Sequence, residues 1–415
     1  MTQAKEILDT RTISRTEYGP YRYSDYYDLS PAYRNFVNSL KTPATKMLYE
    51  YSIKKFYLSL PQNQNLSIEK ILEKPTKTIE YELIDCLYDM KEKQKLSYST
   101  LNIFVSAMFH FFEINDVVLN RRKIKKFRGD NIAKYEYRSY THEEINEVLQ
   151  LLDLRGKTTV LLMASTGMRV GALPDIKLKH LRRWNIENTR NHIYQITVYA
   201  SSIKSKYTTF TTPEAAKTID EYLDYRRRNG DRVKQDPETG NWTPGDSFLL
   251  IKNFDKDQQG LLCLSPSAIF NLPIQSRSIT HAIVDTLRKL GKREKLKLLE
   301  SEAATKPERQ SAYSKHRNEL HPCHSLRIFA VTQMQRAKVD KTIREMLVGH
   351  TTGLDKVYYK PQNEEILQEY LKAIDLLTIS NENRLKKQVD YYKERENDLA
   401  RMSVELAEIK QKLGI

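Results

Sequence analysis

Apolar residues recur at helical spacing through the first third of the chain. From residue 29 to residue 120 they return every three or four positions, and the run STLNIFVSAMFHFFEIN at 99–115 is apolar on nearly all sides. A helix of that composition packs against neighbours all round, and Ser99 or Thr100 offers a side-chain cap for its first turn. The pattern predicts a compact helical domain of about four or five helices at 29–120.

The segments on either side of this domain differ from it in character. Residues 1–28 are polar and tyrosine-rich without a clear period, and they are interpreted as an N-terminal arm. Residues 121–140 are predicted to be a linker, because the basic run RRKIKKFR is followed by the turn signal Gly-Asp-Asn. Such a run is either a solvated surface or a strap that contacts phosphate groups. Its basic residues are Arg121, Arg122, Lys123, Lys125, Lys126 and Arg128.

Residues 141–380 are predicted to form a second domain that is mainly α-helical with a small antiparallel β-sheet. Thr141 and Glu144 have the spacing of a capping box, and the apolar run TTVLLMAST predicts a buried helix that stops at Gly167. Residues rich in β-formers at 193–199 and 207–211 predict a hairpin. Further helices are predicted from 213 to 229, near 278–290, and in the segments HSLRIFAVTQMQRA and KTIREMLVG.

The last part of the chain, residues 381–415, is predicted to be a coiled-coil-like helix. Its apolar residues from Leu385 to Leu413 are spaced 4, 3, 7, 3, 4, 3 and 4 positions apart, close to a heptad seam. Eight basic and seven acidic residues nearly cancel there, so the positive charge of the protein belongs to the two preceding domains. The tail either pairs with a neighbouring protomer or folds back onto its own domain.

The composition points to a polyanionic partner. Among 415 residues, 68 Lys and Arg stand against 53 Asp and Glu, a net charge of +15, and the pI is near 9.3. Nucleic acid is the simplest such partner. Neither a membrane span nor a signal-peptide core is visible, and the three separated cysteines, Cys86, Cys263 and Cys323, fit a reducing compartment. We therefore expect a cytoplasmic, nucleoid-associated protein with no membrane partner.

Four short motifs carry residues suited to phosphodiester chemistry without a metal ion. That chemistry needs charged donors for the phosphate, a nucleophile, and groups that move protons. Arg169 follows the glycine turn in STGMR, His324 and Arg327 share one face of a helix at i and i+3, and His350 follows a predicted glycine cap. The remaining candidates are Tyr358 and Tyr359 in KVYYKP, and Lys204 and Lys206 in the hairpin connection.

The order and spacing of these motifs resemble the tyrosine recombinase (lambda-integrase-like) family. The resemblance covers about 141–378: an Arg, a β-hairpin with Lys, then H-x-L-R, then G-H, then a Tyr nine residues later. The helical domain and the basic linker are similar in placement and size to the core-binding domain of that family. The run GHTTGLDKVYYKP and the heptad tail further resemble archaeal integrases of the same family.

This resemblance implies a role for each candidate. Arg169 and Arg327 would hold the scissile phosphate, His350 would hydrogen-bond it, and His324 would move the proton of the nucleophile. A hairpin lysine would be the general acid for the 5′-oxygen, with Lys204 favoured over Lys206. Tyr359, favoured over Tyr358 by its spacing from His350, would attack phosphorus to give a 3′-phosphotyrosyl link.

Two positions depart from the family pattern, and a metal site is disfavoured. Ala172 stands where many members have an acidic residue, and Ile328 stands where many have a second His. The group His321-Pro-Cys323-His324 has no C-x-x-C or H-x-x-x-H partner that would complete a zinc site. No Walker-type phosphate loop is present. We expect neither a metal nor any other cofactor.

The function implied by the resemblance is site-specific DNA recombination by the integrase of a mobile element. The protein would enclose duplex DNA at its attachment sites as a C-shaped clamp. It would exchange strands as a homotetramer through a Holliday junction, and be a monomer or weak dimer when free. Two alternatives remain: DNA relaxation with type IB topoisomerase chemistry, and a non-catalytic DNA-binding regulator with a coiled-coil tail.

Overall fold

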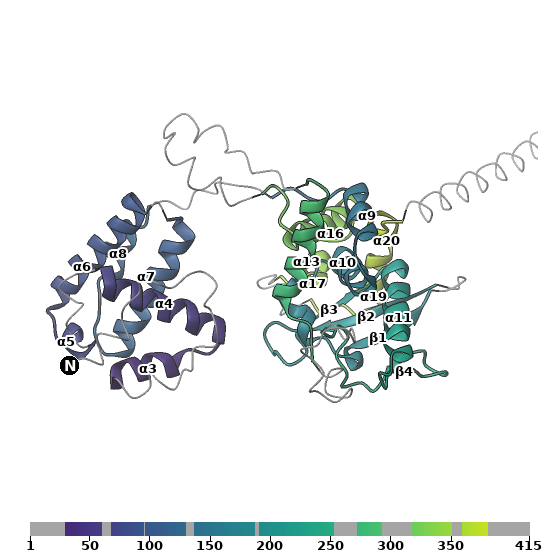
Figure 1. The fold of residues 1–415 in the computed structure, drawn as a ribbon, viewed down its shortest axis with the longest axis horizontal. Coiled ribbons are helices and arrows are strands. Elements are labelled where there is room, and N and C mark those ends of the chain that lie inside the picture. Colours follow the sequence, from purple (N-terminus) through teal and green to yellow (C-terminus); the bar gives the residue numbers. More distant parts are fainter. Residues whose placement is uncertain are drawn as a thin grey trace, which may run out of the picture. The chain divides into compact units, whose positions relative to one another are not determined.

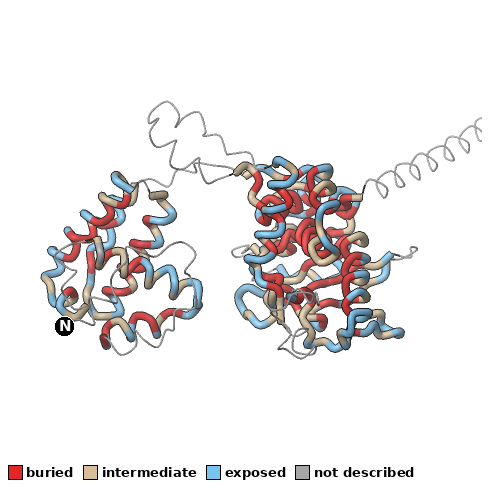
Figure 2. Tube along the Cα trace, viewed as in Figure 1, coloured by how far each residue is buried: buried red, intermediate tan, exposed pale blue. Residues whose placement is uncertain are grey.

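The computed structural model describes residues 30–59, 68–94, 96–129, 137–186, 191–252, 272–292, 318–350 and 359–380. The chain divides into two compact units, whose described residues are 30–129 and 137–380 (Figure 1). In Figure 2 the buried residues gather inside each unit separately, so each has a hydrophobic core of its own. The predicted arm at 1–28 and the predicted tail helix at 381–415 lie outside the described residues.

The first unit is helical, as predicted. Its helices are α3 (Pro31–Ser39), α4 (Pro43–Ser59), α5 (Ile68–Leu72), α6 (Thr76–Tyr88), α7 (Tyr98–Ile114) and α8 (Arg121–Lys126), with a π-helical turn at Asp89–Lys93. The apolar helix α7 supplies much of the core, including Phe104 and Phe112. The predicted cap was wrong by two residues: Ser97 caps α7, because its hydroxyl accepts the Thr100 N–H at 3.3 Å.

The basic run does not form a linker but a short helix of this unit, α8. Asn120 caps the helix, and Ile124, the one apolar residue of RRKIKK, is 1% exposed within the helical core. Several basic side chains are engaged locally: Arg121 with Glu113, and Lys123 with Glu80 at 3.0 Å. The expectation that a linker begins at residue 121 was therefore wrong for residues 121–126, because Ile124 packs in the core of the helical unit.

The second unit is mainly α-helical with small antiparallel sheets, as predicted. Its helices are α9 (His142–Gln150), α10 (Leu154–Thr166), α11 (Pro213–Arg228), α13 (Ser276–Lys289), α16 (His324–Arg336), α17 (Lys341–Leu347), α19 (Asn363–Leu371) and α20 (Ile374–Leu377). The strands β1 (Leu181–Asn185), β2 (His192–Val198) and β3 (Tyr207–Phe210) pair in that order, and β4 (Lys234–Gln235) pairs with β5 (Trp242–Thr243). Short 3₁₀ turns, η3 (Val170–Asp175) and η4 (Leu178–His180), precede β1.

Helix α10 forms the centre of this unit. All its residues from Thr158 to Thr166 are buried, and it packs against α11, α13 and α16 (Figure 1). It ends where the sequence predicted, at Gly167, whose φ of 64° lies in the left-handed region that glycine adopts without strain. The predicted capping box of α9 is also present, with Thr141 and Glu144 satisfying each other's backbone groups. The end of α10 at Gly167 sets where the loop that carries Arg169 begins.

A fully buried arginine ties α11 to the loops that follow it. Arg226 is 0% exposed and donates to the Asp231 carboxylate at 2.8 Å and to the carbonyls of Phe248 and Leu249 at 2.7 and 2.9 Å. The side chain is therefore buried, and its guanidinium is paired with a carboxylate and two carbonyls of the same unit. Removing one partner of such a buried ion pair leaves the other charge buried without compensation, which destabilises the fold.

Replacing Arg226 by Met is expected to lower the free energy of unfolding by about 3–5 kcal/mol, because the buried Asp231 carboxylate then loses its partner. Urea titration would measure the change. Arg227→Met is the matched control, since Arg227 pairs with Asp224 at the surface, where such a pair is worth at most about 1 kcal/mol. Equal effects of the two substitutions would contradict the prediction.

None of the helices in the described ranges combines the length and apolar character that a membrane crossing requires.

Candidate active site

The first candidate, Arg169, follows the glycine turn at the end of α10. Met168 is fully buried between Gly167 and Arg169, and the backbone then becomes extended at Arg169, which precedes η3. The Arg169 side chain is exposed. The turn thus anchors the backbone in the core while the guanidinium stays accessible to a ligand.

Arg327 is held by two backbone segments that are distant in sequence. It is 5% exposed on α16 and donates to the Gly167 carbonyl at 2.6 Å and to the Val348 carbonyl at 2.8 Å. Burial, followed by the positive charge of Arg169, lowers the pKa of Arg327 from its ordinary value. Two guanidinium groups therefore lie within electrostatic reach of each other, which is unfavourable unless an anion joins them.

His324, the first residue of α16, belongs to the same cluster. Its side chain is exposed, and its pKa is lowered first by partial burial and then by the charges of Arg327 and Arg169. A lowered pKa means that the imidazole is neutral at neutral pH and able to accept a proton. The i, i+3 spacing in the sequence predicted that His324 lies near Arg327. That spacing gives no information on Arg169, which the fold brings close enough to act on His324.

His350 lies near the cluster at the end of α17. Its Nδ1 contacts the Glu345 carboxylate, and its backbone N–H donates to the Glu345 carbonyl at 2.9 Å. The negative charge of Glu345 also acts on Arg327. With Nδ1 occupied, Nε2 is the nitrogen left to face a ligand. Glu345 was not predicted from the sequence, where its only signal is its place five residues before the histidine.

Tyr207 is a second residue that the sequence analysis missed. Its hydroxyl is buried and makes no well-aligned hydrogen bond with any described residue, although Arg327 and Arg169 both act on it electrostatically. Burial raises the pKa of Tyr207 to about 12. Its ring packs directly against Gly349. A Cβ at position 349 would lie 2.4 Å from Tyr207 Cε1, so a larger residue would clash there. The chain has 26 tyrosines, so nothing in the sequence distinguished this one.

The two candidate lysines lie in the turn between β2 and β3. Lys204 and Lys206 are both exposed, and the turn is held by Ser202, whose hydroxyl accepts the Ser205 N–H at 3.0 Å. Ile203 beside them is 100% exposed. No side-chain bond to another described residue distinguishes one lysine from the other, so both stay candidates.

Tyr359 is not part of the cluster in this structure. It is 37% exposed, and its hydroxyl donates to the Glu365 carboxylate on α19. That bond chiefly raises the pKa of Tyr359 to about 12, and the other charges acting on it come from Asp340 and Glu369. The surroundings of this hydroxyl are therefore acidic rather than basic. Tyr358 lies outside the described residues.

The positions that depart from the family pattern are apolar in the fold as well. Ala172 is 1% exposed in the core, and Ile328 is half-buried on α16. Neither place holds a polar group that could support the arginines. Glu345 is one carboxylate that acts on Arg327.

No metal centre is found among the described residues, where no group of three His, Cys, Asp or Glu side chains gathers. In the segment His321–His324, the Cys323 thiol is 3% exposed and its neighbour is the Thr280 hydroxyl at 3.6 Å. Burial raises the pKa of Cys323, which opposes the thiolate form that binds metals. The donor set does not fit a zinc ion.

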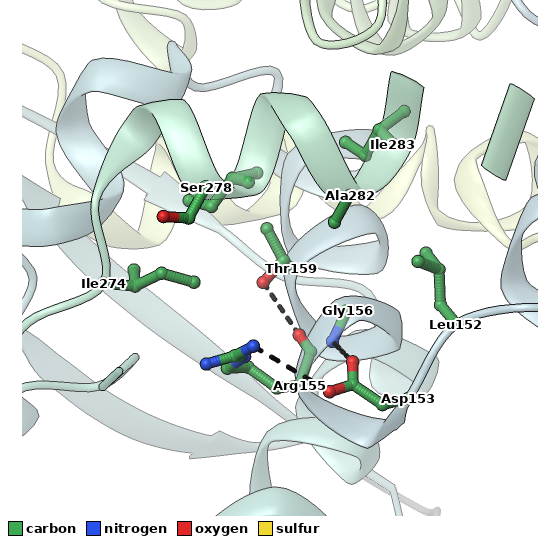
Figure 3. Close-up of a pocket in the computed structure, with 10 residues that line it drawn as sticks. Leu152, Asp153, Arg155, Gly156, Thr159, Ile274, Ser278, Ala282 and Ile283 are labelled. Carbon is green, nitrogen blue, oxygen red and sulfur yellow. Dashed lines mark hydrogen bonds and ion pairs between the residues drawn. The ribbon is translucent and has the colours of Figure 1, made fainter. Parts of the chain in front are cut away.

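A small pocket between the start of α10 and α13 is separate from the arginine cluster (Figure 3). Its walls include Leu152, Ile279 and Ile283, and none of the candidate site residues lines it. Arg155, which also borders it, donates to the Ile251 carbonyl at 3.2 Å. The pocket is therefore not part of the candidate site.

The cluster can therefore bind an anion of phosphate-like geometry. Arg327 has N–H groups beyond the two used for backbone carbonyls, Arg169 is accessible, and both histidines present ring nitrogens. A neutral imidazole beside two cations is suited to accepting a proton from an attacking hydroxyl.

Comparison with known proteins gives a partial match. No family model matches the sequence. The tyrosine recombinase XerC of Lactobacillus delbrueckii subsp. bulgaricus (strain ATCC BAA-365 / Lb-18) is 28% identical over 219 residues, which cover 49% of this chain and 61% of the relative. XerC of Lactobacillus leichmannii gives the same identity and coverage. The chain thus spans about three fifths of the length of the curated relatives it matches.

Solved structures show more distant likenesses. The integrase of the Tn1549 transposon in complex with transposon right-end DNA has a TM-score of 0.47 at 13% identity, covering 82% of this chain and 98% of that one. A lambda integrase tetramer bound to a Holliday junction has a TM-score of 0.45 at 14% identity, covering 87% and 88%. In sequence, the chain is similar to tyrosine recombinases over about half of its length.

Proposed function

We propose that the protein is a site-specific DNA recombinase of the tyrosine type. It cuts and rejoins duplex DNA through a 3′-phosphotyrosyl intermediate, without a metal ion or ATP. The observation that carries the proposal is the cluster of Arg169, Arg327 and His324, in which Arg327 is fixed by the carbonyls of Gly167 and Val348 and both arginines act electrostatically on the His324 imidazole. The similarity of the chain to XerC recombinases over about half of its length supports the same function.

The two arginines hold the scissile phosphate. A guanidinium matches the geometry of two phosphate oxygens, and its charge stabilises the additional negative charge of the transition state. Arg327 is fixed by the carbonyls of Gly167 and Val348, so its remaining N–H groups are oriented before the DNA binds. His350 adds a hydrogen bond through Nε2, with Glu345 orienting the ring through Nδ1.

His324 removes the proton of the nucleophile, and a hairpin lysine protonates the leaving 5′-oxygen. The lowered pKa of His324 favours the neutral base at physiological pH. We favour Lys204 as the acid, with Lys206 the alternative. Tyr359 is the nucleophile, with Tyr358 the alternative, and its hydroxyl must leave Glu365 before it attacks phosphorus.

Duplex DNA containing the attachment sites is the substrate and partner. Two protomers acting on each of two sites make a homotetramer, which is the assembly that strand exchange through a Holliday junction requires. The run GHTTGLDKVYYKP favours the integrase of a mobile element of the archaeal type. The helical unit supplies sequence-independent contacts to phosphates through the exposed basic residues of α8.

A suicide substrate, nicked so that the cleaved strand cannot be rejoined, tests the proposal directly. A covalent protein–DNA adduct is expected, and it should form equally well in EDTA because the arginines supply the charge that a metal would supply. A strict need for Mg²⁺ would contradict the mechanism. A plasmid with two sites then separates recombination from relaxation of supercoils at a single site.

The salt dependence of DNA binding tests the role of α8. Lys125 and Lys126 are exposed, and replacing both by Ala should reduce the slope of log K against log salt by about two units, one for each lost phosphate contact. Lys123→Ala is the control, because its ammonium already pairs with Glu80 at 3.0 Å. If the double substitution leaves the slope unchanged, α8 is a solvated surface.

A further inference from the structure

The segment at the start of the second unit is bound to the turn that begins α16. The Arg138 N–H donates to the Glu319 carbonyl at 3.1 Å, and the Tyr140 hydroxyl donates to the Pro322 carbonyl at 3.2 Å. The Arg138 guanidinium bridges the carboxylates of Glu319, at 3.2 Å, and Glu144, at 2.8 Å. These bonds fix the backbone of residues 138–140 against the residues that precede His324.

Tyr137, at the end of this segment, packs its ring against two histidines. Its ring centroid lies 5.2 Å from that of His321 and 6.2 Å from that of His324, with interplanar angles of 76° and 78°. The two histidine rings are 5.9 Å apart at 85°. All three contacts are edge-to-face, the arrangement that the quadrupoles of aromatic rings favour.

The contacts of the His324 imidazole are with aromatic rings. Within the described ranges, this imidazole makes no hydrogen bond, and its side chain is exposed. His321 is itself fixed, because its Nδ1 accepts the backbone N–H of His324 at 3.0 Å. A side chain with a free χ1 and no hydrogen bond would populate several rotamers. The rings of Tyr137 and His321 reduce the number of rotamers open to His324.

We propose that Tyr137 is a positioning residue for His324, and that its ring keeps the imidazole on the side of Arg327 and Arg169. The inference rests on the proposed function for the role of His324 in proton transfer. The positioning itself is a property of the folded protein without DNA, and it can be measured independently of activity.

Removing the ring should change the titration of His324 in a defined direction. The groups that face this imidazole are Arg327, Arg169, His321 and Tyr137. Partial burial is the largest cause of the lowered pKa of His324, ahead of the two arginines. Without the Tyr137 ring, water reaches the imidazole and the pKa should rise toward its ordinary value. Adduct formation, which needs the neutral imidazole, should then require a higher pH.

The first experiment follows the histidine ring signals by NMR through a pH titration of the full chain without DNA. His324→Gln assigns the signal. The variants are Tyr137→Phe, which keeps the ring, and Tyr137→Leu and Tyr137→Ala, which both remove it. Tyr225→Ala is the matched control, because Tyr225 is 42% exposed on α11 of the same unit. The His324 midpoint should rise in the Leu and Ala variants and stay in place in the Phe variant and the control.

The second experiment measures the rate of adduct formation on the suicide substrate between pH 5.5 and 8. At pH 6.5, Tyr137→Ala should be roughly 3- to 10-fold slower than the wild type, the loss expected when one ring contact no longer orients a catalytic group. Part of the rate should return at pH 8, and Tyr137→Phe should remain within about twofold of the wild type at each pH.

The outcomes separate the two hypotheses. Tyr137→Leu and Tyr137→Ala titrating like the wild type at His324 would overturn the positioning role. A wild-type protein that forms no adduct on any substrate would overturn the proposed function, and the NMR titration would still decide whether Tyr137 positions His324.

Discussion

Replacing Tyr359 by Phe is expected to abolish the covalent adduct while leaving DNA binding unchanged. The phenolic oxygen is the atom that attacks phosphorus in the proposed mechanism, and phenylalanine lacks it. The residue is exposed and its hydroxyl donates to Glu365 at the surface, so the substitution should not disturb the fold. Gel analysis of a labelled suicide substrate measures the adduct, and a mobility shift measures binding.

Tyr358→Phe is the control for this prediction. It should retain adduct formation, and the opposite pair of results would make Tyr358 the nucleophile. Glu365→Gln is an informative companion, because Glu365 is the main cause that raises the pKa of Tyr359 to about 12. Because the Glu365 carboxylate also holds the hydroxyl in a hydrogen bond, its removal frees the nucleophile and should speed adduct formation rather than slow it.

Replacing Arg327 by Gln is expected to slow adduct formation by about 100- to 1000-fold, the loss typical of removing one preorganised donor from a developing charge. Stability should fall as well, because the buried carbonyls of Gly167 and Val348 lose the N–H groups that donate to them. Arg327→Lys should recover little of the rate, since an ammonium cannot reach both carbonyls and still present a planar fork to phosphate. Single-turnover kinetics and urea titration measure the two effects.

Arg169→Gln separates the catalytic from the structural part of this prediction. Its side chain is exposed and holds no described backbone group, so the rate should fall while the free energy of unfolding stays within about 0.5 kcal/mol of the wild type. Full activity of both arginine variants would show that the cluster is not the site of phosphate chemistry.

Local signals in the sequence determined the helices, the small sheet and part of the site. The capping box at Thr141 and the glycine at 167 act within one or two helical turns, so their structural outcome follows from neighbouring residues. The same is true of His324 and Arg327, which a helix places on one face whatever the rest of the fold does. Hydrophobic periodicity in 29–120 was equally sufficient to predict a helical domain.

Tertiary packing decided the features that depend on residues distant in sequence. The basic run became helix α8 because Ile124 finds a core built by α6 and α7, which a charge pattern does not reveal. The approach of Arg169 to Arg327 depends on the Gly167 carbonyl, which lies 160 residues before its donor.

The same reason explains the tyrosines. Tyr207 and Tyr137 had no distinguishing signal in the sequence, and Tyr359 had only its spacing from His350. In the fold, the Tyr207 hydroxyl is buried beside two arginines, Tyr137 packs on two histidines and Tyr359 is bound by a carboxylate. The chemical environment of a phenol is set by the groups that surround it in space. Chain folding brings those groups from other elements, so residue type and local spacing alone do not define them.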